Sequence, residues 1–225
     1  MQPTEAYKVV EMFDSLEGEG KRAGATATFI RLAGCNLRCS YCDTTYAISN
    51  DAVHSLMTAN EIISELHRRG FSRVTLTGGE PLLAPGIDAL VFDMIAKGFE
   101  VNIETNGSVD ISPFLQETTD RLFFTIDYKL PSSGETEKML PENYKNLRSW
   151  DVLKFVVGDQ NDAEHMIDVL ENLENKKPLV YIGAVYDSFS LQKLAEIIIA
   201  NPVLHNARLQ LQFHKIIWHP EQRGV

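Results

Sequence analysis

The feature that most constrains the fold of this chain is a repeated alternation of short apolar runs with helical patterns. Strands are predicted over residues 7–13, 28–32, 73–77, 99–104, 122–126, 152–157, 179–185 and 209–213. Most of these runs are continuously apolar, which is typical of strands covered on both faces. Repeated alternation of strand and helix indicates βαβ units and a parallel sheet.

Start and stop signals define the helices between these strands. Thr58 and Glu61 form a capping-box pattern before an apolar helix face, and Gly70 provides the stop. Further helices are predicted over residues 87–97, 161–173 and 190–200. The connection over residues 131–150 is not clearly helical.

We interpret residues 1–225 as a single domain, because the chain contains neither a composition-biased linker nor an internal repeat. A complete eightfold α/β barrel usually needs roughly 250 residues. The sequence therefore favours an α/β fold of the incomplete, splayed (β/α) TIM-like barrel type, with a doubly wound open sheet as the alternative. In either fold, functional residues belong at the carboxyl ends of the strands.

Composition narrows the possible partners. The net charge of -10 argues against a general nucleic-acid surface, which would be basic. No apolar run approaches the roughly 20 residues of a membrane span, and the polar N-terminus lacks the pattern of a signal peptide. We therefore expect a cytoplasmic protein that binds neither nucleic acid nor membrane.

The only cysteines, Cys35, Cys39 and Cys42, lie within eight residues of each other, directly after the predicted strand over residues 28–32. Three cysteines cannot all pair within one chain, so a metal role in a reducing compartment fits better than a disulfide framework. Three thiolates can hold three irons of a cubane iron–sulfur cluster and leave the fourth open. A zinc site using these cysteines and a remote histidine is the alternative.

Polar motifs follow two further strands. Thr77-Gly78-Gly79-Glu80-Pro81 ends one of them, where glycines would allow a close approach of the backbone to a ligand and Glu80 would pair with an ammonium group. A plain strand-to-helix turn is the alternative. Glu104-Thr105-Asn106-Gly107 ends the next strand, either as a polar ligand site or as a hydrogen-bonded turn.

Three other segments carry charge in unusual places. Thr125, Asp127 and Lys129 alternate and would share one strand face, either around a ligand or as an internal ion pair. Arg31 lies in an apolar strand, so it must meet an internal carboxylate or an anionic substrate. Gln210, Gln212 and His214 alternate over residues 209–214, facing either the barrel interior or the outside.

The spacing C-x3-C-x2-C with Tyr41 before the last cysteine resembles the radical S-adenosylmethionine family, as does T-G-G-E-P. Within that family the chain resembles the 7-carboxy-7-deazaguanine synthases of queuosine precursor biosynthesis. The shared segments are L-x-G-E-G at 16–20, F-I-R-L-x-G-C at 29–35, C-D-T at 42–44, E-T-N-G at 104–107, and H-K-x-x-W-x-P-x-x-R-G-V at 214–225.

The resemblance implies a carbon–nitrogen lyase that converts 6-carboxy-5,6,7,8-tetrahydropterin to 7-carboxy-7-deazaguanine with loss of ammonia. A 5′-deoxyadenosyl radical, formed from S-adenosylmethionine at a 4Fe–4S cluster, would start the ring contraction. The resemblance also implies a homodimer, and an electron donor such as flavodoxin.

The implied site residues fall into four groups. Metal ligands would be Cys35, Cys39 and Cys42 for the cluster and Thr44 for Mg²⁺. S-adenosylmethionine would meet Tyr41, Gly79, Glu80, Thr105, Asn106, Thr125, Asp127 and Lys129. The pterin would meet Leu16, Glu17, Gly18, Thr77, Glu104, His214 and the C-terminal Val225, with Arg31 on its carboxylate. Glu104 and His214 are the candidates for proton transfer.

Two positions depart from the common family pattern. Glu17 stands where relatives often have Gln, and Asp127-Tyr128-Lys129 replaces a Ser-Pro-Lys version. Two other functions remain as alternatives. One is an enzyme that activates a glycyl-radical partner through the same cluster, and the other is a non-catalytic metal-binding or redox-sensing module.

Overall fold

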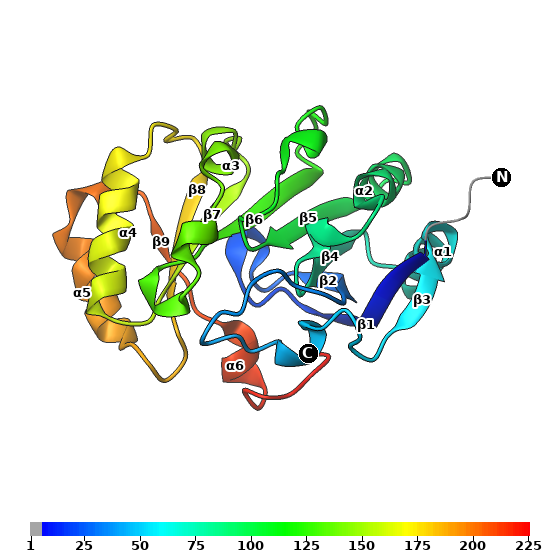
Figure 1. Cartoon of the computed structure of the whole chain (residues 1–225), viewed down its shortest axis with the longest axis horizontal. Helices are drawn as coiled ribbons and strands as arrows, with labels where there is room; N and C mark the ends of the chain where they lie inside the picture. The colour runs from blue at the N-terminus through cyan, green and yellow to red at the C-terminus, as the bar shows by residue number, and fades with distance from the viewer. Residues whose placement is uncertain (1–5) are drawn as a thin grey trace.

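A nine-stranded sheet runs through residues 6–225, the part of the chain that this computed structural model describes (Figure 1). The polar N-terminal segment used above to argue against a signal peptide lies outside that part. The strand order is β3 (Ser55–Thr58), β1 (Ala6–Leu16), β2 (Thr26–Leu32), β4 (Arg73–Gly78), β5 (Glu100–Thr105), β6 (Leu122–Tyr128), β7 (Val152–Val157), β8 (Leu179–Ala184) and β9 (Arg208–Leu209).

The sheet is parallel from β2 onward. β2 and β4 to β9 pair in parallel, while β1 is antiparallel to both β2 and β3. The sheet stays open between the outer strands β3 and β9. This arrangement confirms the predicted α/β fold with an incomplete, splayed barrel.

The connecting helices are α1 (Ala59–Arg69), α2 (Ile87–Ala96), α3 (Pro141–Lys145), α4 (Gln160–Asn172), α5 (Leu191–Ala200) and α6 (Phe213–Ile217). The capping box of α1 is confirmed: Thr58 Oγ1 accepts from Glu61 N at 3.3 Å, and Glu61 Oε2 accepts from Thr58 N at 2.8 Å. Gly70 ends α1 in the left-handed region, with φ at 81°.

The largest correction concerns residues 209–213. β9 is only two residues long, because after the bond from Gln210 N to Ile182 O the chain leaves the sheet. Phe213 N then donates to Gly18 O at 3.1 Å and begins α6. Strand β3 was not predicted. The helix expected over residues 161–173 begins one residue earlier, capped by Asp159.

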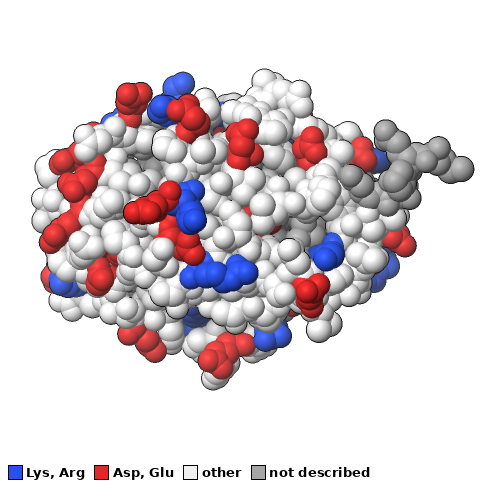
Figure 2. Space-filling model, viewed as in Figure 1, with Lys and Arg blue, Asp and Glu red and all other residues white. Residues whose placement is uncertain are grey.

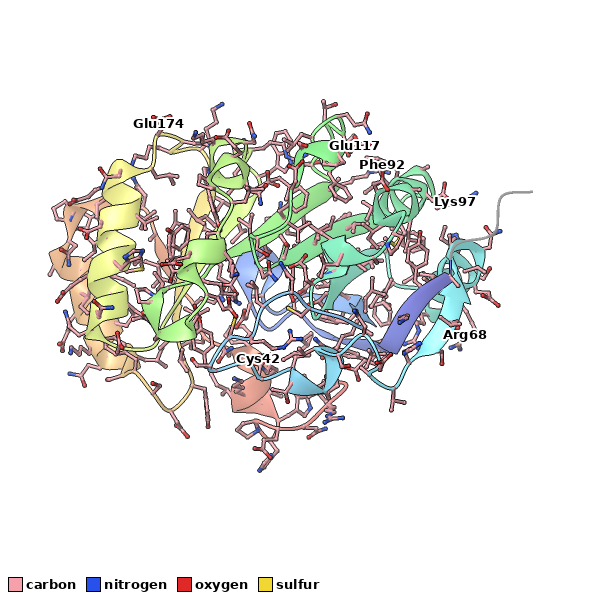
Figure 3. The ribbon with its side chains drawn as sticks, in the orientation of Figure 1. Cys42, Arg68, Phe92, Lys97, Glu117 and Glu174 are labelled. Atoms are coloured by element: carbon pink, nitrogen blue, oxygen red, sulfur yellow. The ribbon has the colours of Figure 1, made fainter. Side chains whose placement is uncertain are left out.

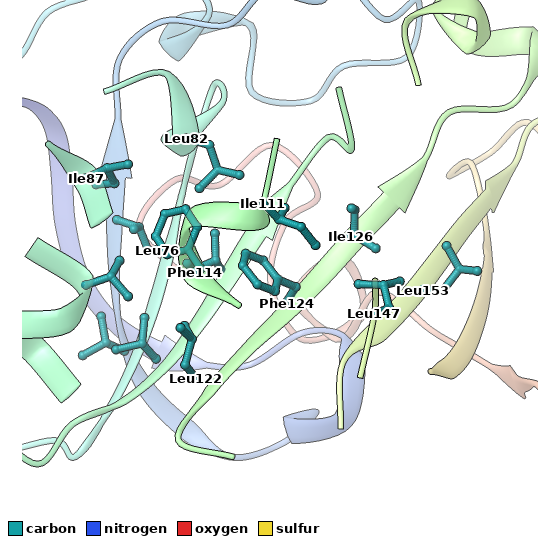
Figure 4. Close-up of a cluster of buried hydrophobic side chains, with 14 of the residues drawn as sticks. Leu76, Leu82, Ile87, Ile111, Phe114, Leu122, Phe124, Ile126, Leu147 and Leu153 are labelled. Carbon is teal, nitrogen blue, oxygen red and sulfur yellow. The ribbon is translucent and has the colours of Figure 1, made fainter. Parts of the chain in front are cut away.

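The hydrophobic core lies between the sheet and its helices (Figure 4). Strand residues such as Leu76, Phe124 and Leu153 belong to one buried cluster with Leu82 and Ile111. The strands that looked uniformly apolar therefore have two different faces, because alternate residues point to opposite sides.

The opposite face of the sheet carries polar residues and is covered by the β1–β2 loop rather than by helices. Arg22 of this loop donates to Glu100 O and Val74 O, and Gly20 N donates to Gln210 Oε1 at 2.6 Å. The inside of the open barrel is therefore filled from one end by residues 17–25. This arrangement excludes the doubly wound alternative, in which helices would cover both faces.

Candidate active site

The motifs predicted from the sequence meet at one cavity of about 950 Å³ at the carboxyl ends of the strands. Its lining includes Leu16, Gly18, Arg31, Tyr41, Cys42, Thr44, Thr77, Gly79, Glu104, Thr105, Asn106, Thr125, Asp127, Lys129, His214 and Val225. Four predicted site residues, Glu17, Cys35, Cys39 and Glu80, do not line it. Figure 3 shows Cys42 on the loop after β2, just above α6 in this view.

The cysteine loop lies against both the core and the cavity. Cys35 and Cys39 pack on the hydrophobic core, and Cys42 faces the cavity. Within residues 6–225, no three His, Cys, Asp or Glu side chains converge in an arrangement that would hold a metal ion. Desolvation raises the pKa of the Cys39 thiol to about 11. The three cysteine sulfurs of the loop are the ligands that an iron–sulfur cluster uses, and they are unpaired and half-buried.

The Gly78-Gly79 turn packs against the cysteine loop and the strand before it. A Cβ on Gly78 would lie 2.3 Å from Leu32 O, and one on Gly79 would lie 2.2 Å from Gly34 O. The close approach is thus between two segments of this chain. Gly79 still lines the cavity, so its backbone remains open to a ligand.

Glu80 joins two motif loops instead of facing the cavity. Its Oε2 accepts from Asn106 N at 2.7 Å, and its Oε1 accepts from Thr105 Oγ1 at 2.8 Å and Leu82 N at 3.0 Å. Desolvation raises its pKa to about 7, although these donors oppose the shift. The expected pairing of Glu80 with an ammonium group is therefore not supported, since internal donors occupy its carboxylate.

The alternation at the end of β6 is confirmed, because Thr125, Asp127 and Lys129 all line the cavity. Lys129 Nζ pairs with Asp127 Oδ2 at 3.0 Å, which is the internal ion pair considered from the sequence. Asp127 Oδ1 and the Tyr41 hydroxyl are buried and have no hydrogen-bond partner among residues 6–225. Orphaned buried polar atoms at a cavity wall fit a polar ligand such as S-adenosylmethionine.

Lys154, which the sequence analysis missed, lies on β7 among the carboxylates of the cavity. Its Nζ pairs with Glu19 and lies 3.9 Å from Asp127 Oδ2. Desolvation lowers the pKa of Lys154, but the charges of Glu19, Asp127 and Glu104 outweigh that effect and raise it overall. The side chain therefore stays cationic.

Glu104 is a half-buried carboxyl of the cavity wall beside this lysine. Desolvation raises the pKa of Glu104 to about 7; Lys154 opposes the shift, and Glu17 and Glu19 add to it. A carboxyl with this pKa changes protonation near neutral pH, which suits a proton-transfer role. Thr77, the other predicted pterin contact on this wall, supplies a hydrogen bond to Glu104.

The carboxylate of Glu17 lies beneath the cavity rather than in its wall. It accepts from Arg22 Nη2 at 2.6 Å and also from the Thr75 hydroxyl. The predicted contact of its side chain with substrate is not supported, because this ion pair and hydrogen bond hold the carboxylate below the cavity. Glu17 carries a negative charge that the Gln common in relatives lacks, and Arg22 balances this charge.

Arg31 meets both of the conditions considered for it. Its Nε donates to Glu11 Oε1 at 2.7 Å, so an internal carboxylate is present. The side chain nevertheless lines the cavity, and no hydrogen bond from its Nη atoms is found within residues 6–225.

The C-terminal segment closes one side of the cavity. His214, Arg223 and Val225 line it, and the Arg223 guanidinium lies 3.8 Å from the centroid of the Tyr46 ring. Desolvation lowers the pKa of His214. Thr44 Oγ1 donates to Asp43 Oδ1 at 3.0 Å, which places two oxygen groups suited to Mg²⁺ at the same rim.

The face of the molecule in Figure 2 carries mixed charge. Figure 2 shows Lys and Arg interspersed with Asp and Glu over the described residues on this side of the molecule. None of the helices within residues 6–225 combines the length and apolar character needed to cross a membrane.

Comparison with known sequences reveals a match along nearly the whole chain. Residues 29–128 match the Radical SAM superfamily. A 7-carboxy-7-deazaguanine synthase of Clostridium acetobutylicum is 43% identical over 97% of this chain and 99% of its own length. One from Methanospirillum hungatei is 38% identical over 95% of this chain and 86% of its own length.

Solved structures agree with this match. The crystal structure of QueE from Escherichia coli superposes with a TM-score of 0.73 at 26% identity, covering 92% of this chain and 94% of that one. Streptococcus suis SuiB bound to its precursor peptide SuiA, at 15% identity and a TM-score of 0.60, covers 79% of this chain and 47% of its own length, and shares the fold alone.

Proposed function

The chain belongs to the 7-carboxy-7-deazaguanine synthase family of radical S-adenosylmethionine enzymes, and from this premise we propose how its cavity is divided between cluster, cofactor and substrate. Its reaction is the conversion of 6-carboxy-5,6,7,8-tetrahydropterin to 7-carboxy-7-deazaguanine with loss of ammonia. A 4Fe–4S cluster and S-adenosylmethionine are its cofactors. The observation that carries the proposal is that the segments shared with the family line one cavity.

In the cluster region, Cys35, Cys39 and Cys42 would hold three irons, leaving the fourth for the cofactor. When bound there, S-adenosylmethionine supplies the radical that starts the reaction. Asn106 Nδ2 lies 3.7 Å from Cys35 Sγ, so this amide would donate to a cluster thiolate and stabilise its charge.

In the cofactor region, Tyr41, Gly79, Asp127 and Lys129 would surround S-adenosylmethionine, with Thr105, Asn106 and Thr125 completing the wall. Asp127 has a buried oxygen without a partner in the described part of the chain and can accept from the cofactor, while Lys129 can meet a carboxylate. Glu80 would act on this region indirectly, by fixing Thr105 and Asn106.

In the substrate region, the backbone of residues 16–18 would meet the edge of the pterin, together with Thr77 and Glu104. Arg31 would bind the carboxylate through its Nη atoms. Glu104 and His214 would hold or move protons, since both lie in the cavity wall. Burial raises the pKa of Glu104 to about 7 and lowers the pKa of His214. The carboxylate of Val225 would close the pocket.

We further propose that Thr44 and Asp43 contribute oxygens to a Mg²⁺ site at the rim. We propose as well that residues 1–225 form one domain, supported by the single sheet and single core of the described residues. A homodimer, a reduced flavodoxin as electron donor and a cytoplasmic location, without nucleic-acid or membrane binding, complete the proposal. The unpaired cysteines support the cytoplasmic location, and the acidic net charge of -10 supports the absence of nucleic-acid binding.

Anaerobic turnover with 6-carboxy-5,6,7,8-tetrahydropterin tests the assignment. Reconstituted protein with S-adenosylmethionine, reductant and Mg²⁺ is expected to form 7-carboxy-7-deazaguanine. Arg31→Ala should retain cluster absorbance and cofactor binding but lose substrate turnover. Cofactor cleavage without product in the wild-type protein would contradict the substrate assignment and favour an activating enzyme.

A further inference from the structure

We propose that Glu11 and Tyr46 are positioning residues that set the orientation of the Arg31 guanidinium and thereby the selectivity of the site for a carboxylated pterin. This inference rests on the proposed role of Arg31 in binding the substrate carboxylate. It concerns two residues that the shared family segments do not single out as ligand contacts.

A β-bulge places Glu11 opposite Arg31. In the antiparallel pair of β1 and β2, Val9 is opposite Leu32, whereas the next paired residue is Glu11, opposite Arg31. Without the extra residue, Val10 would face Arg31 and Glu11 would move to the other side of the sheet. Bulges re-aim side chains in this way beside functional sites.

Glu11 is held by two donors at once. Arg31 Nε and the Tyr46 hydroxyl each donate to Glu11 Oε1 at 2.7 Å. Directly opposed residues of opposite charge across an antiparallel pair stabilise each other. Since Glu11 takes only Nε, the two Nη groups remain for a second carboxylate, which an arginine can bind in bidentate fashion.

Aromatic rings restrict the guanidinium further. Its carbon lies 5.8 Å from the centroids of both the Phe13 and Tyr46 rings, and Phe13 is stacked on Phe29 at 5.0 Å. The guanidinium is therefore held laterally by rings and at one end by Glu11. A fixed arginine binds an anion with less loss of side-chain freedom than a mobile one.

Charge balance also favours one carboxylate as the ligand. The Arg223 guanidinium lies over the ring of Tyr46. The cluster of Glu11, Arg31, Tyr46 and Arg223 therefore holds two cations and one anion. Such a cluster complements a single negative charge. The C-terminal segment, which carries Arg223, thus reaches the same group that Glu11 orients.

The test compares two ligands. Steady-state KM is measured for 6-carboxy-5,6,7,8-tetrahydropterin, and the inhibition constant is measured for 5,6,7,8-tetrahydropterin, which lacks the carboxylate. Glu11→Gln keeps an amide oxygen for Arg31 Nε but loses the charge of the carboxylate, so it should raise KM by about threefold to fivefold and leave the inhibition constant unchanged. Tyr46→Phe should act in the same direction by about threefold to tenfold, because a neutral donor is lost.

Asp14→Asn is the matched control. Asp14 lies on the same strand and also pairs with an arginine, Arg69, but its carboxylate bonds Thr28 outside the cavity. Neither ligand should be affected by it. Thermal unfolding and cluster absorbance of each variant show whether the fold and the cofactor site remain intact.

Three outcomes are distinguishable. A selective loss of the carboxylated ligand in Glu11→Gln and Tyr46→Phe supports the proposal. If Arg31→Lys loses that ligand selectively but Glu11→Gln and Tyr46→Phe weaken both ligands equally or neither, the positioning role is overturned while the function of Arg31 stands. If Arg31→Lys does not discriminate between the ligands, the carboxylate contact itself is wrong, and the positioning role falls with it.

Discussion

Gly18 packs directly against the imidazole of His214, so that a Cβ on Gly18 would lie 2.7 Å from His214 Nδ1. Phe213 N also donates to Gly18 O at 3.1 Å. The first and last of the distinguishing family segments are therefore one structural unit, although about 200 residues separate them in the sequence. This contact explains why a residue without a side chain stands at position 18.

Gly18→Ala is expected to push His214 out of the cavity wall. The backbone at Gly18 is not in the left-handed region, so the cost arises from crowding rather than strain, at about 1–3 kcal/mol. We expect a higher KM for the pterin and unchanged cofactor binding in steady-state and equilibrium measurements. In the control Gly183→Ala, a Cβ would meet Gln210 O at 3.5 Å, which is an ordinary contact. Equal effects of the two substitutions would contradict this account.

Lys154→Met should destabilise the protein strongly. The substitution leaves the carboxylate of Glu19 buried without its cation, and breaking a buried pair from one side typically costs about 3–5 kcal/mol. In the double variant Lys154→Met/Glu19→Gln no unpaired charge remains at this point, so part of the stability should return. Urea unfolding of the four proteins of this double-mutant cycle measures the coupling. Additive effects would mean that the pair is not energetically coupled.

The sequence predicted the order of strands and helices well where local signals are strong. The capping box at Thr58 and the stop at Gly70 act within a few residues, so they can be read without tertiary information. Residues 209–213 have strand-like alternation, but α6 begins there because Gly18, distant in sequence, receives the bond of Phe213. Such a long-range competitor leaves no local signal.

Most of the residues predicted for the site line one cavity, but the carboxylates of Glu17 and Glu80 do not. Glu17 and Glu80 lie in motifs, and motifs do not distinguish a side chain that meets a ligand from one that holds the loop together. Lys154 was missed even though a single lysine inside the apolar strand Val152–Val157 poses the same problem as Arg31. Lys154 therefore carries the same sequence signal as Arg31, a lone charge in an apolar strand that needs an internal partner or a ligand.

The raised pKa of Glu104 predicts a pH-dependent stability. With a native pKa of about 7 against an ordinary value of 4.5, the folded protein holds a proton that the unfolded chain has released across this window. The contribution of Glu104 to stability therefore falls as pH rises from 4.5 to 7. Glu104→Gln lacks this loss, so its unfolding free energy relative to wild type should rise by up to about 1.4 kcal/mol per pH unit.

Urea unfolding of cluster-free protein from about pH 5 to pH 8 checks this prediction. Only the difference between the two proteins is interpreted, because Glu80, Glu17 and His214 also have shifted pKa values and contribute to the pH dependence of both. A difference that stays constant over the range would show that Glu104 is ionised in the folded protein well below neutral pH.

Glu17 and Arg22 should respond unequally to substitution. Glu17→Gln keeps an amide oxygen that can accept from Arg22 and Thr75, so we expect a loss of no more than about 1 kcal/mol. Arg22→Met instead leaves the Glu17 carboxylate buried without a cation, at a cost of about 3–5 kcal/mol, and frees the loop that positions residues 16–18. Adding Glu17→Gln to Arg22→Met should recover stability, because the unpaired charge is then removed. Denaturant unfolding measures all three variants, and a larger loss in Glu17→Gln than in Arg22→Met would show that the carboxylate itself, rather than its pairing, holds the loop in the barrel.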